Sequence, residues 1–260
     1  MRNQVVSPKD GVAWVTGASS GIGRDTAIAL CAEGWRVAGT ARREKDLQDL
    51  ADEVKDLPGS IHPYAADVTD RSAMAGVVEA IEADQGPLAL VILNAGIYLP
   101  LEVPEFDAEI FEKSFSVNVL GTAYGLESVI PRMIGRSKGH IAMVSSVTGY
   151  GGLPTSAAYG ATKAALINMA EAMKIELDRH GVRVSIINPG FVETPAQDDN
   201  AFPKPFMIPS KKAADLIVKG LKRQAFEITF PKIFTYQLKI LKWLPRDWYI
   251  ALIKRQTGWV

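Results

Sequence analysis

The sequence predicts an α/β fold: a single-domain, doubly wound parallel sheet of about seven strands flanked by helices. Three observations predict it. Short apolar runs alternate with longer helical stretches from Gly11 onward, a length of 260 residues suits one domain of this class, and no internal repeat, low-complexity tract or linker divides the chain. The expected strands are Val12 to Thr16, Arg36 to Thr40, Ile61 to Ala65, Leu88 to Leu93, His140 to Val144, Val182 to Ile187 and Glu227 to Phe230, with helices in the intervals. We assign residues 1–231 to this domain and residues 232–260 to a C-terminal amphipathic extension of it.

The charge balance and the cysteine content narrow the class of protein. With 29 basic and 29 acidic residues, the chain has no global field that would attract nucleic acid, so we expect no nucleic-acid partner. The single cysteine, Cys31, excludes an intrachain disulfide, and its expected role is helix packing. No cysteine or histidine spacing predicts a metal site. Residues 1–10 lack the apolar core of a secretory signal, and no run of about 18 apolar residues could span a bilayer, so we expect a cytoplasmic protein.

A glycine-rich segment, Thr16 to Gly23, follows the first expected strand and precedes a helix expected over Arg24 to Glu33. Glycine lets a backbone approach a phosphate closely, and the N–H groups at a helix N-terminus point at the anion. A dinucleotide pyrophosphate is therefore expected there, although a glycine turn without a ligand is the alternative. The residues expected to contact it are Gly17, Ser19, Ser20, Gly21, Ile22 and Gly23.

Tyr159 and Lys163 stand four residues apart in an alanine-rich stretch that predicts a helix beginning near Thr155 or Ser156. Side chains at this spacing lie on one face of a helix, so an ammonium group can sit beside a phenol. A free phenol has a pKa of about 10, and a neighbouring cation favours the phenolate. The pair can therefore act as an acid/base, while a surface helix that happens to carry both residues is the alternative.

Three further motifs accompany this pair: Asn94-Ala95-Gly96 after the fourth expected strand, Ser146 after the fifth, and Pro189-Gly190 after the sixth. In this order, together with the glycine segment and Tyr-x-x-x-Lys, they resemble the short-chain dehydrogenase/reductase superfamily from about residue 11 to residue 231. The resemblance implies a Rossmann-type fold and hydride transfer between a nicotinamide and a carbonyl or alcohol. It also implies a catalytic set, which is Asn118, Ser146, Tyr159 and Lys163.

The resemblance gives these side chains roles. Tyr159 would exchange a proton with the carbonyl oxygen, Ser146 would orient and polarise that oxygen, and Lys163 would lower the pKa of Tyr159 and hold the nicotinamide ribose. Ser146 is preferred over Ser145 because its interval to Tyr159 matches the family.

Asn118 lies within a helix expected from about Ala108 to Met133, where a buried asparagine is unfavourable unless it is hydrogen-bonded. The resemblance implies that it accompanies a local helix distortion and a water in a proton relay to Lys163. A hydrogen-bonded packing asparagine is the alternative.

The end of the second expected strand bears on the choice of cofactor. Ala41 stands where NAD-preferring members of the superfamily place an aspartate for the ribose 2′-hydroxyl, and Arg42 and Arg43 follow it. An arginine can donate bidentate, charge-assisted hydrogen bonds to a 2′-phosphate. We therefore expect NADP rather than NAD, with Arg42 the stronger candidate; solvated arginines at a helix start are the alternative.

The resemblance also assigns the remaining cofactor contacts. Asp67 would contact adenine and Val68 would supply a backbone amide, although a turn aspartate is the alternative. The other expected contacts are Asn94, Ala95 and Gly96 at the adenosine ribose, Tyr159 and Lys163 at the nicotinamide end, and Pro189, Gly190, Val192 and Thr194 around the nicotinamide carboxamide.

The segment from Phe191 to Pro209 is expected to be irregular, and its part from Ala196 to Ile208 is expected to cover the substrate. Nearby apolar residues indicate a mainly apolar small-molecule carbonyl or alcohol as substrate, although ordinary packing could use the same side chains. They are Tyr98, Leu153, Phe191, Phe202, Phe206 and Met207. The resemblance further implies a homodimer or homotetramer through the helices around residues 108–133 and 156–180.

The extension departs from the superfamily, many of whose members end soon after the seventh strand. On a helical wheel Lys232, Lys239 and Lys242 fall on one side and Phe234, Leu238, Leu241 and Leu244 on the other. From Lys232 to Arg255, six residues are basic and one, Asp247, is acidic. Packing on the chain's own core or on another subunit is the favoured interpretation, and peripheral contact with a membrane surface is the alternative.

Two classes of function remain open. The complete catalytic set favours an NADP-dependent oxidoreductase with Tyr159 as general acid/base, because a protein without turnover has no reason to keep proton-transfer groups. The alternative is a catalytically silent NADP-binding regulatory or scaffold protein.

Overall fold

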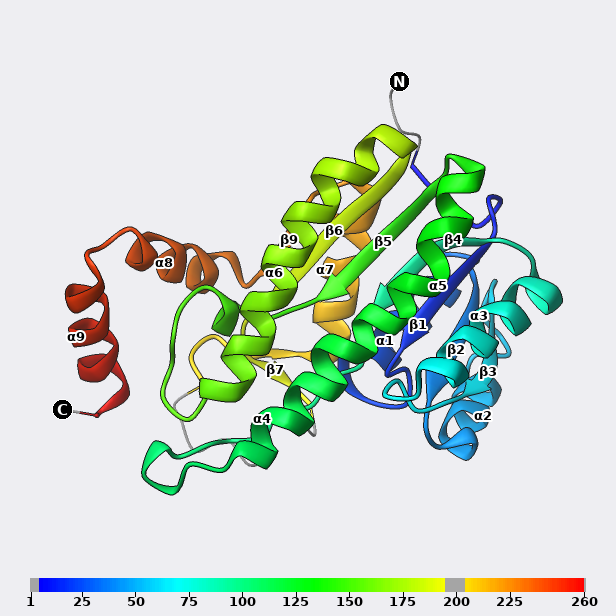
Figure 1. Ribbon diagram of the computed structural model, residues 1–260. Coiled ribbons are helices and arrows are strands. Elements are labelled where there is room, and N and C mark those ends of the chain that lie inside the picture. Colours follow the sequence, from blue (N-terminus) through cyan, green and yellow to red (C-terminus); the bar gives the residue numbers. More distant parts are fainter. Residues whose placement is uncertain (1–4, 195–203, 260) are drawn as a thin grey trace.

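A parallel sheet of seven strands forms the centre of the protein, in the order β3-β2-β1-β4-β5-β6-β9 (Figure 1). The computed structural model describes residues 5–194 and 204–259. The strands of this sheet are β1 (Val12–Thr16), β2 (Arg36–Ala41), β3 (Ser60–Ala65), β4 (Leu88–Leu93), β5 (Gly139–Val144), β6 (Val182–Pro189) and β9 (Glu227–Phe230). Because the winding reverses between β1 and β4, the predicted doubly wound Rossmann-type sheet is confirmed.

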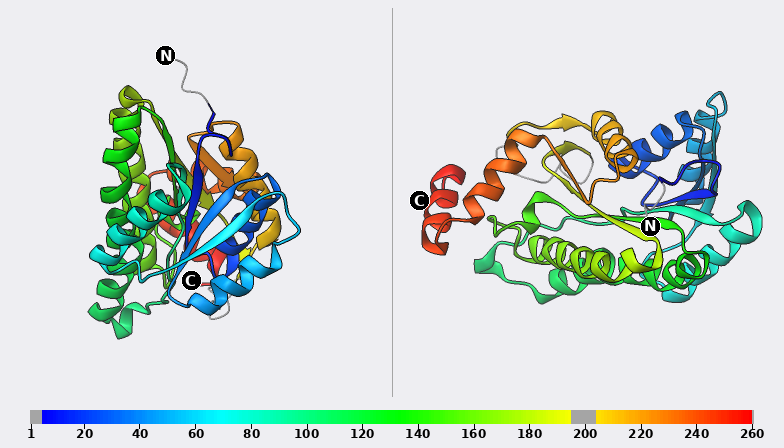
Figure 2. Two further views of the ribbon diagram at one scale, coloured as in Figure 1. Left: turned by 90° about the vertical axis from the view of Figure 1, so that its right-hand side faces the viewer. Right: turned by 90° about the horizontal axis from the view of Figure 1, so that it is seen from above.

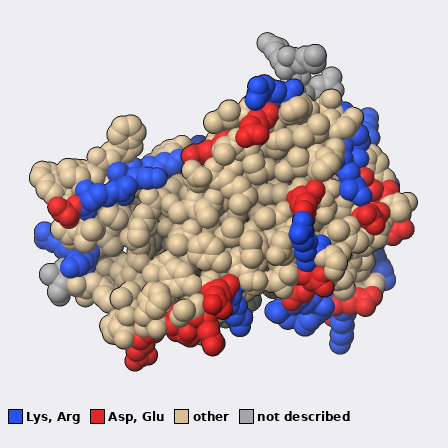
Figure 3. Space-filling model, in the orientation of Figure 1, with Lys and Arg blue, Asp and Glu red and all other residues tan. Residues whose placement is uncertain are grey.

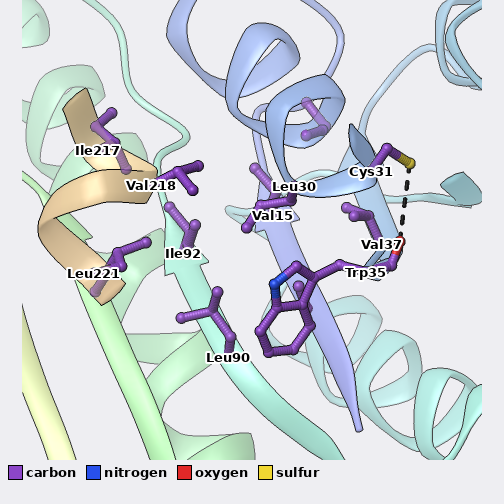
Figure 4. Close-up of a cluster of buried hydrophobic side chains, with 14 of the residues drawn as sticks. Val15, Leu30, Cys31, Trp35, Val37, Leu90, Ile92, Ile217, Val218 and Leu221 are labelled. Atoms are coloured by element: carbon purple, nitrogen blue, oxygen red, sulfur yellow. Dashed lines mark hydrogen bonds between the residues drawn. The ribbon is translucent and has the colours of Figure 1, made fainter. Parts of the chain in front are cut away.

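Helices cover both faces of the sheet (Figure 2). One face is covered by α1 (Gly21–Ala32), α2 (Glu44–Glu53) and α7 (Ser210–Lys222), and the other by α3 (Arg71–Gln85), α5 (Gly121–Arg136) and α6 (Ala157–Leu177). Each group of helices contributes to its own buried apolar cluster with the side chains of the strands between. Ile217 and Leu221 of α7, four residues apart, reach the sheet beside Leu90 and Ile92 of β4 (Figure 4).

Burial on both faces explains why the central strands read as continuous apolar runs. Every residue of β1 and of β4 is buried. Trp14 satisfies its one polar group inside the core, where the indole Nε1 donates to Thr40 Oγ1 at 2.9 Å. Cys31 packs in the cluster under α1, as expected, and burial raises the pKa of its thiol to about 12 (Figure 4).

Two helices differ from the expected boundaries. α1 begins at Gly21 rather than Arg24, because the extended residue Ser20 directly before it is the N-cap. The helix expected from Ala108 to Met133 consists of α4 (Ala108–Phe115), a π-helical turn (Ser116–Leu120) and α5, which continues to Arg136. The helix distortion that the resemblance implied at Asn118 is therefore present.

Part of the segment that was expected to be irregular forms a second, two-stranded sheet. β7 (Val192–Glu193) pairs in parallel with β8 (Ile208–Pro209). The Ile208 N–H also donates to the Phe191 carbonyl at 3.1 Å. Phe202 and most of the expected lid, residues 196–203, lie outside the described residues.

The extension folds as α8 (Lys232–Lys242) and α9 (Arg246–Thr257), which project past the edge strand β9 (Figures 1 and 2). Leu238 is buried in a cluster with Val147 and Tyr150, against which Phe234 and Leu241 also pack. One apolar face of α8 thus packs on the chain's own core, in line with the favoured interpretation. Within the described residues, no helix is both long enough and apolar enough to cross a membrane.

Candidate active site

A cavity of about 690 Å³ opens at the carboxyl ends of the parallel strands. Residues from six separate strand ends meet there because the sheet brings them to one edge. Of the residues predicted to form the site, those that line the cavity are Gly17, Ser19, Ser20, Gly21, Ile22, Arg42, Arg43, Asp67, Val68, Asn94, Ala95, Gly96, Ser146, Tyr159, Lys163, Pro189, Gly190, Val192 and Thr194. Gly23 and Asn118 are not among the lining residues, and they act through the packing described below.

Gly17 and Gly23 let the turn after β1 lie directly against the loop after β4. Gly17 has a φ of +67°, and a Cβ on it would lie 2.9 Å from both the Asn94 side-chain nitrogen and the Ala95 Cα. A Cβ on Gly23 would lie 2.3 Å from the Asn94 side-chain nitrogen and from the Gly17 carbonyl oxygen.

The first turn of α1 has no acidic residue, and Ser20 makes no side-chain capping bond. The N–H groups of this turn can therefore receive an anion, which fits a dinucleotide pyrophosphate.

Thr16, which sequence reasoning did not select, fixes this arrangement. Its Oγ1 accepts the backbone N–H groups of Asn94 at 3.0 Å and Ala95 at 3.1 Å, and the Asn94 side-chain amide donates to the Thr16 carbonyl at 3.0 Å. These bonds join the ends of β1 and β4. No sequence signal identifies this role, because a threonine at the end of a strand is common in any sheet.

Arg42 and Arg43 are both exposed after β2, yet they differ in their partners. The Arg43 guanidinium pairs with the Asp46 carboxylate, which raises the pKa of Arg43. Arg42 forms no salt bridge with any described residue and lines the cavity. Of the two arginines, only Arg42 therefore has its guanidinium available to an anion bound in the cavity.

Asp67 lines the cavity as a turn aspartate. Its Oδ1 accepts the backbone N–H of Thr69 at 2.9 Å and the Thr69 hydroxyl at 2.8 Å. The backbone bond is the largest cause that holds the pKa of Asp67 below its usual value, and the charge of Arg42 lowers it further. The aspartate is thus ionised and held in its turn, close enough to Arg42 for the charge of the arginine to act on it.

Tyr159 and Lys163 face the cavity from the first turns of α6. The Lys163 ammonium lies 5.4 Å from the centroid of the Tyr159 ring and donates to the Val144 carbonyl at 2.9 Å. Burial lowers the pKa of Lys163 to about 8. Burial also raises the pKa of Tyr159 to about 12, although a hydrogen bond with Ser146 acts in the opposite direction. The pKa of Tyr159 is thus raised in this structure because desolvation of the phenolate is the largest effect, and the expected influence of Lys163 on it stays a prediction.

The two neighbouring serines at the end of β5 differ in the same way as the two arginines. The Ser145 hydroxyl donates to the Lys163 carbonyl at 2.7 Å, so its proton is already used in a hydrogen bond to the backbone of α6. The Ser146 oxygen accepts the Thr148 N–H at 3.2 Å and is hydrogen-bonded to Tyr159. The Ser146 hydroxyl is therefore the one that can meet an oxygen atom in the cavity.

Asn118 is fully buried in the π-helical turn, and its side-chain amide is well bonded. Its Oδ1 accepts the Ile97 N–H at 2.8 Å, and its Nδ2 donates to the Ile97 carbonyl at 3.0 Å and to Thr162 Oγ1 at 3.1 Å. These bonds tie the loop after β4 to α6 next to Lys163, as the packing alternative expected. The water relay stays a prediction.

The turn after β6 also lines the cavity. The Gly190 N–H donates to the Phe230 carbonyl at 2.7 Å, and Val192 is buried in β7. The Thr194 side chain reaches α1, since a Cβ on Gly21 would lie 3.0 Å from the Thr194 methyl carbon. Pro189, Gly190, Val192 and Thr194 thus form one wall of the cavity, which meets the glycine turn where Thr194 approaches Gly21.

The lining of the cavity beside Tyr159 includes both apolar and polar side chains. The Tyr98 ring meets that of Tyr159 edge to face, with centroids 5.1 Å apart. Lys113 and Ser116, which sequence reasoning did not select, add polar groups to the lining. Four other described residues that were expected around the substrate do not line the cavity. They are Leu153, Phe191, Phe206 and Met207. Phe191 and Phe206 instead contact Phe234 of α8, with centroids 5.7 and 6.2 Å away.

Comparisons with known proteins agree with this geometry. The short chain dehydrogenase family model matches residues 11–202. An uncharacterized oxidoreductase of Myxococcus xanthus is 37% identical over 243 residues, which cover 94% of this chain and 96% of the relative. A 3-oxoacyl-[acyl-carrier-protein] reductase of Thermotoga maritima is 35% identical over 184 residues, covering 71% of this chain and 75% of the relative.

A solved structure extends the likeness to the whole fold. A short chain dehydrogenase/reductase of Burkholderia phymatum in complex with NAD covers 95% of this chain and 96% of its own, with a TM-score of 0.81. At 23% identity, this likeness shows the fold alone. Taken with the family model and the two relatives, the cavity and its side chains show that the chain belongs to the short chain dehydrogenase family of oxidoreductases.

Proposed function

We propose that the protein is an NADP-dependent oxidoreductase that transfers hydride between the nicotinamide and a carbonyl or alcohol carbon of a mainly apolar small molecule. The observation that carries the proposal is the presence of Ser146, Tyr159 and Lys163 in the same cavity as the glycine turn after β1. The relative from Thermotoga maritima, a 3-oxoacyl reductase by name, supports carbonyl reduction as the class of reaction.

The choice of NADP rests on the end of β2. Ala41 has no side-chain oxygen to accept a bond from a ribose 2′-hydroxyl. The guanidinium of Arg42, which forms no salt bridge with a described residue, can donate bidentate, charge-assisted hydrogen bonds to a 2′-phosphate. Along the cavity, the first turn of α1 would hold the pyrophosphate, Asp67 and Val68 the adenine, and Asn94 to Gly96 the adenosine ribose. The wall formed by Val192 and Thr194 would hold the nicotinamide carboxamide.

The bound cofactor supplies the hydride, and the chain's own residues handle the proton. Tyr159 would give its proton to the carbonyl oxygen in reduction and take one from the alcohol in oxidation. The Ser146 hydroxyl would orient and polarise the same oxygen. With a pKa of about 8, Lys163 is mostly charged at neutral pH, so it would stabilise the negative charge that develops on the Tyr159 oxygen.

The lining beside Tyr159 supports an apolar substrate. Ile97, Tyr98 and Leu99 give this part of the cavity apolar surface, while Lys113 and Ser116 leave room for one polar group on the substrate. We also propose a cytoplasmic homodimer or homotetramer that assembles through α5 and α6.

Turnover of NADPH with a panel of apolar aldehydes and ketones tests the proposal. We expect at least one substrate to be reduced, and Tyr159→Phe to lower kcat by roughly 10²- to 10⁴-fold while NADPH still binds, because only the proton donor is lost. Tyr64→Phe, at an edge-strand tyrosine that does not line the cavity, is the matched control. Tight NADPH binding without turnover across the panel would contradict the proposal and favour a cofactor-binding protein that is catalytically silent.

A further inference from the structure

The outward side of α8 carries a second apolar stripe, opposite the side that packs on the core. Ile233, Tyr236, Ile240 and Trp243 recur at helical spacing, so they lie in one narrow sector of the helix. They are 65, 49, 68 and 90% exposed, and Trp248 at the start of α9 is 66% exposed. An apolar patch of this kind on a protein surface marks a contact site.

Exposed basic residues lie on the same two helices as this stripe. Five basic side chains of the extension are exposed; they are Lys232, Lys242, Arg246, Lys254 and Arg255. The single acidic residue of the extension is Asp247. Figure 3 shows Lys and Arg gathered over the end of the molecule where α8 and α9 lie. This end of the molecule therefore combines an exposed apolar stripe with exposed basic side chains.

The inner contacts of the extension hold this surface in a fixed position. Glu227 of β9 pairs with Lys239 of α8 and also accepts the Tyr150 hydroxyl and, at 2.9 Å, the Asn188 amide. On α9, the Tyr249 hydroxyl donates to the Gly152 carbonyl at 3.0 Å. Because these contacts use the inner sides of both helices, the exposed stripe has no remaining place on the core of its own chain.

We propose that the outer face of α8 and the start of α9 bind the surface of an anionic lipid bilayer. Tryptophan and tyrosine favour the headgroup level of a membrane, aliphatic side chains enter the acyl boundary, and exposed lysine and arginine attract anionic lipids. A second copy of the chain fits less well, because a two-fold contact would bring two sets of these basic side chains together. The charge complementarity therefore selects the bilayer.

Flotation with vesicles tests this proposal. The full-length protein should float with vesicles of phosphatidylglycerol and phosphatidylcholine, and not with phosphatidylcholine alone.

Lys242→Gln combined with Arg246→Gln should lower the partition coefficient by roughly 25-fold, at about 1 kcal/mol per cation. Ile240→Ser combined with Trp243→Ser should lower it by roughly tenfold or more, because less apolar surface enters the boundary. Val103→Ser, at another residue with 66% exposure, is the matched control and should float like the original protein.

All the substituted side chains are exposed, so unchanged thermal unfolding verifies that the variants fold. Truncation after Pro231 is less informative, because it would uncover Val147 and Tyr150. The proposal is overturned if the protein does not float with anionic vesicles, or if the double variants float as well as the original. It is also overturned in favour of a second copy if sedimentation shows a dimer that Ile240→Ser with Trp243→Ser dissociates. None of these readouts uses turnover, so they are independent of the proposed reaction.

Discussion

At the residue scale, the site is decided by which hydrogen bonds and ion pairs each polar side chain already makes. Ser145 gives its proton to the Lys163 carbonyl, and Arg43 is paired with Asp46. Ser146 and Arg42, their neighbours in sequence, both face the cavity: Ser146 is bonded to Thr148 and Tyr159, and Arg42 forms no salt bridge with a described residue. In each pair, one residue is thus held by a bond within the chain and the other is the one proposed to act in the site, and each difference can be tested by comparing the two.

Arg42→Ala should raise the Kd of NADPH by roughly 10- to 100-fold and leave that of NADH unchanged. The reason is that a hydrogen bond to a charged group contributes about 1.5–3 kcal/mol, and only NADPH carries the 2′-phosphate. Fluorescence titration of both cofactors measures the effect. Arg43→Ala is the control and should change either Kd less than about threefold, as expected for an exposed arginine paired with Asp46. An equal loss of NADH affinity in Arg42→Ala would show that this arginine does not recognise the 2′-phosphate.

The sequence could predict the residues of the site that belong to motifs, and it could not predict those that act through packing. The spacing of Tyr159 and Lys163, and that of the glycines after β1, is typical of motifs that can be recognised in a sequence. Thr16 and Lys113 stand at no such interval, because their roles come from strand ends and helices that meet only in the folded chain. The pKa of Tyr159 depends on burial, which a one-turn spacing to Lys163 does not reveal.

At the scale of the elements, the glycine turn after β1 is a contact between backbones. Gly23→Ala would place a Cβ 2.3 Å from Asn94 and the Gly17 carbonyl, so the turn and the β4 loop would have to separate. We expect a loss of about 1–3 kcal/mol in the free energy of unfolding, together with weaker NADPH binding. Urea unfolding and cofactor titration measure the two effects.

Gly76→Ala provides the control for this substitution. Gly76 lies inside α3, and a Cβ there would meet nothing within 4 Å. Alanine should therefore stabilise the protein by about 0.5–1 kcal/mol and leave NADPH binding unchanged. If Gly23→Ala bound NADPH as tightly as the original protein, the close approach of the two backbones would not matter for the cofactor site.

The two apolar sides of α8 should differ in their contribution to stability. Leu238 is 9% exposed and packs against Val147 and Tyr150, whereas Ile240, two residues on, is 68% exposed. Leu238→Ala should lower the free energy of unfolding by about 2–3 kcal/mol, and Ile240→Ala should change it by less than about 0.5 kcal/mol. Denaturant unfolding of the two variants checks this. Equal effects would mean that the extension is not docked through Leu238.

The element boundaries show why the sequence pattern was informative in some places and not in others. The strands of the main sheet are long apolar runs, so their positions were predictable. β7 and β8 have two residues each, which is too short for any periodicity. In α8 the helical wheel identified the apolar side that packs on the core. The other side is apolar as well, because it carries Ile233, Ile240 and Trp243, so only the folded structure shows which side is covered.

At the scale of the whole molecule, the order of the strands explains how residues far apart in the chain form one site. β1 and β4 are neighbours in the sheet, and their carboxyl ends bring Gly17 beside Asn94. β5 and β6 continue the same edge with Ser146 and Gly190. The alternation of strands and helices predicts this meeting because parallel strands joined by crossovers all end at one edge.

The same parallel sheet buries a histidine that should control the response of the whole protein to acid. His140 of β5 is 2% exposed, and its Nε2 lies 2.8 Å from the Ser185 hydroxyl. Because Ser185 gives its proton to the Ala225 carbonyl at 2.7 Å, its oxygen accepts from the histidine, which fixes the neutral tautomer with the proton on Nε2. Burial, with the charges of Arg183 and Lys174, lowers the pKa of His140 from 6.5 to about 3.

The unfolded chain therefore binds a proton at this histidine over a pH range in which the folded protein does not. Between pH 6.5 and about 3, the contribution of His140 to the free energy of unfolding falls as the pH decreases, with a slope that approaches about 1.4 kcal/mol per pH unit. His140→Gln keeps a donor toward Ser185 and cannot take up this proton, so its stability should fall less steeply across the range. Urea unfolding at a series of pH values measures the slopes, with the exposed His180→Gln as control. Equal slopes in the original protein and His140→Gln would mean that this histidine does not limit stability in acid.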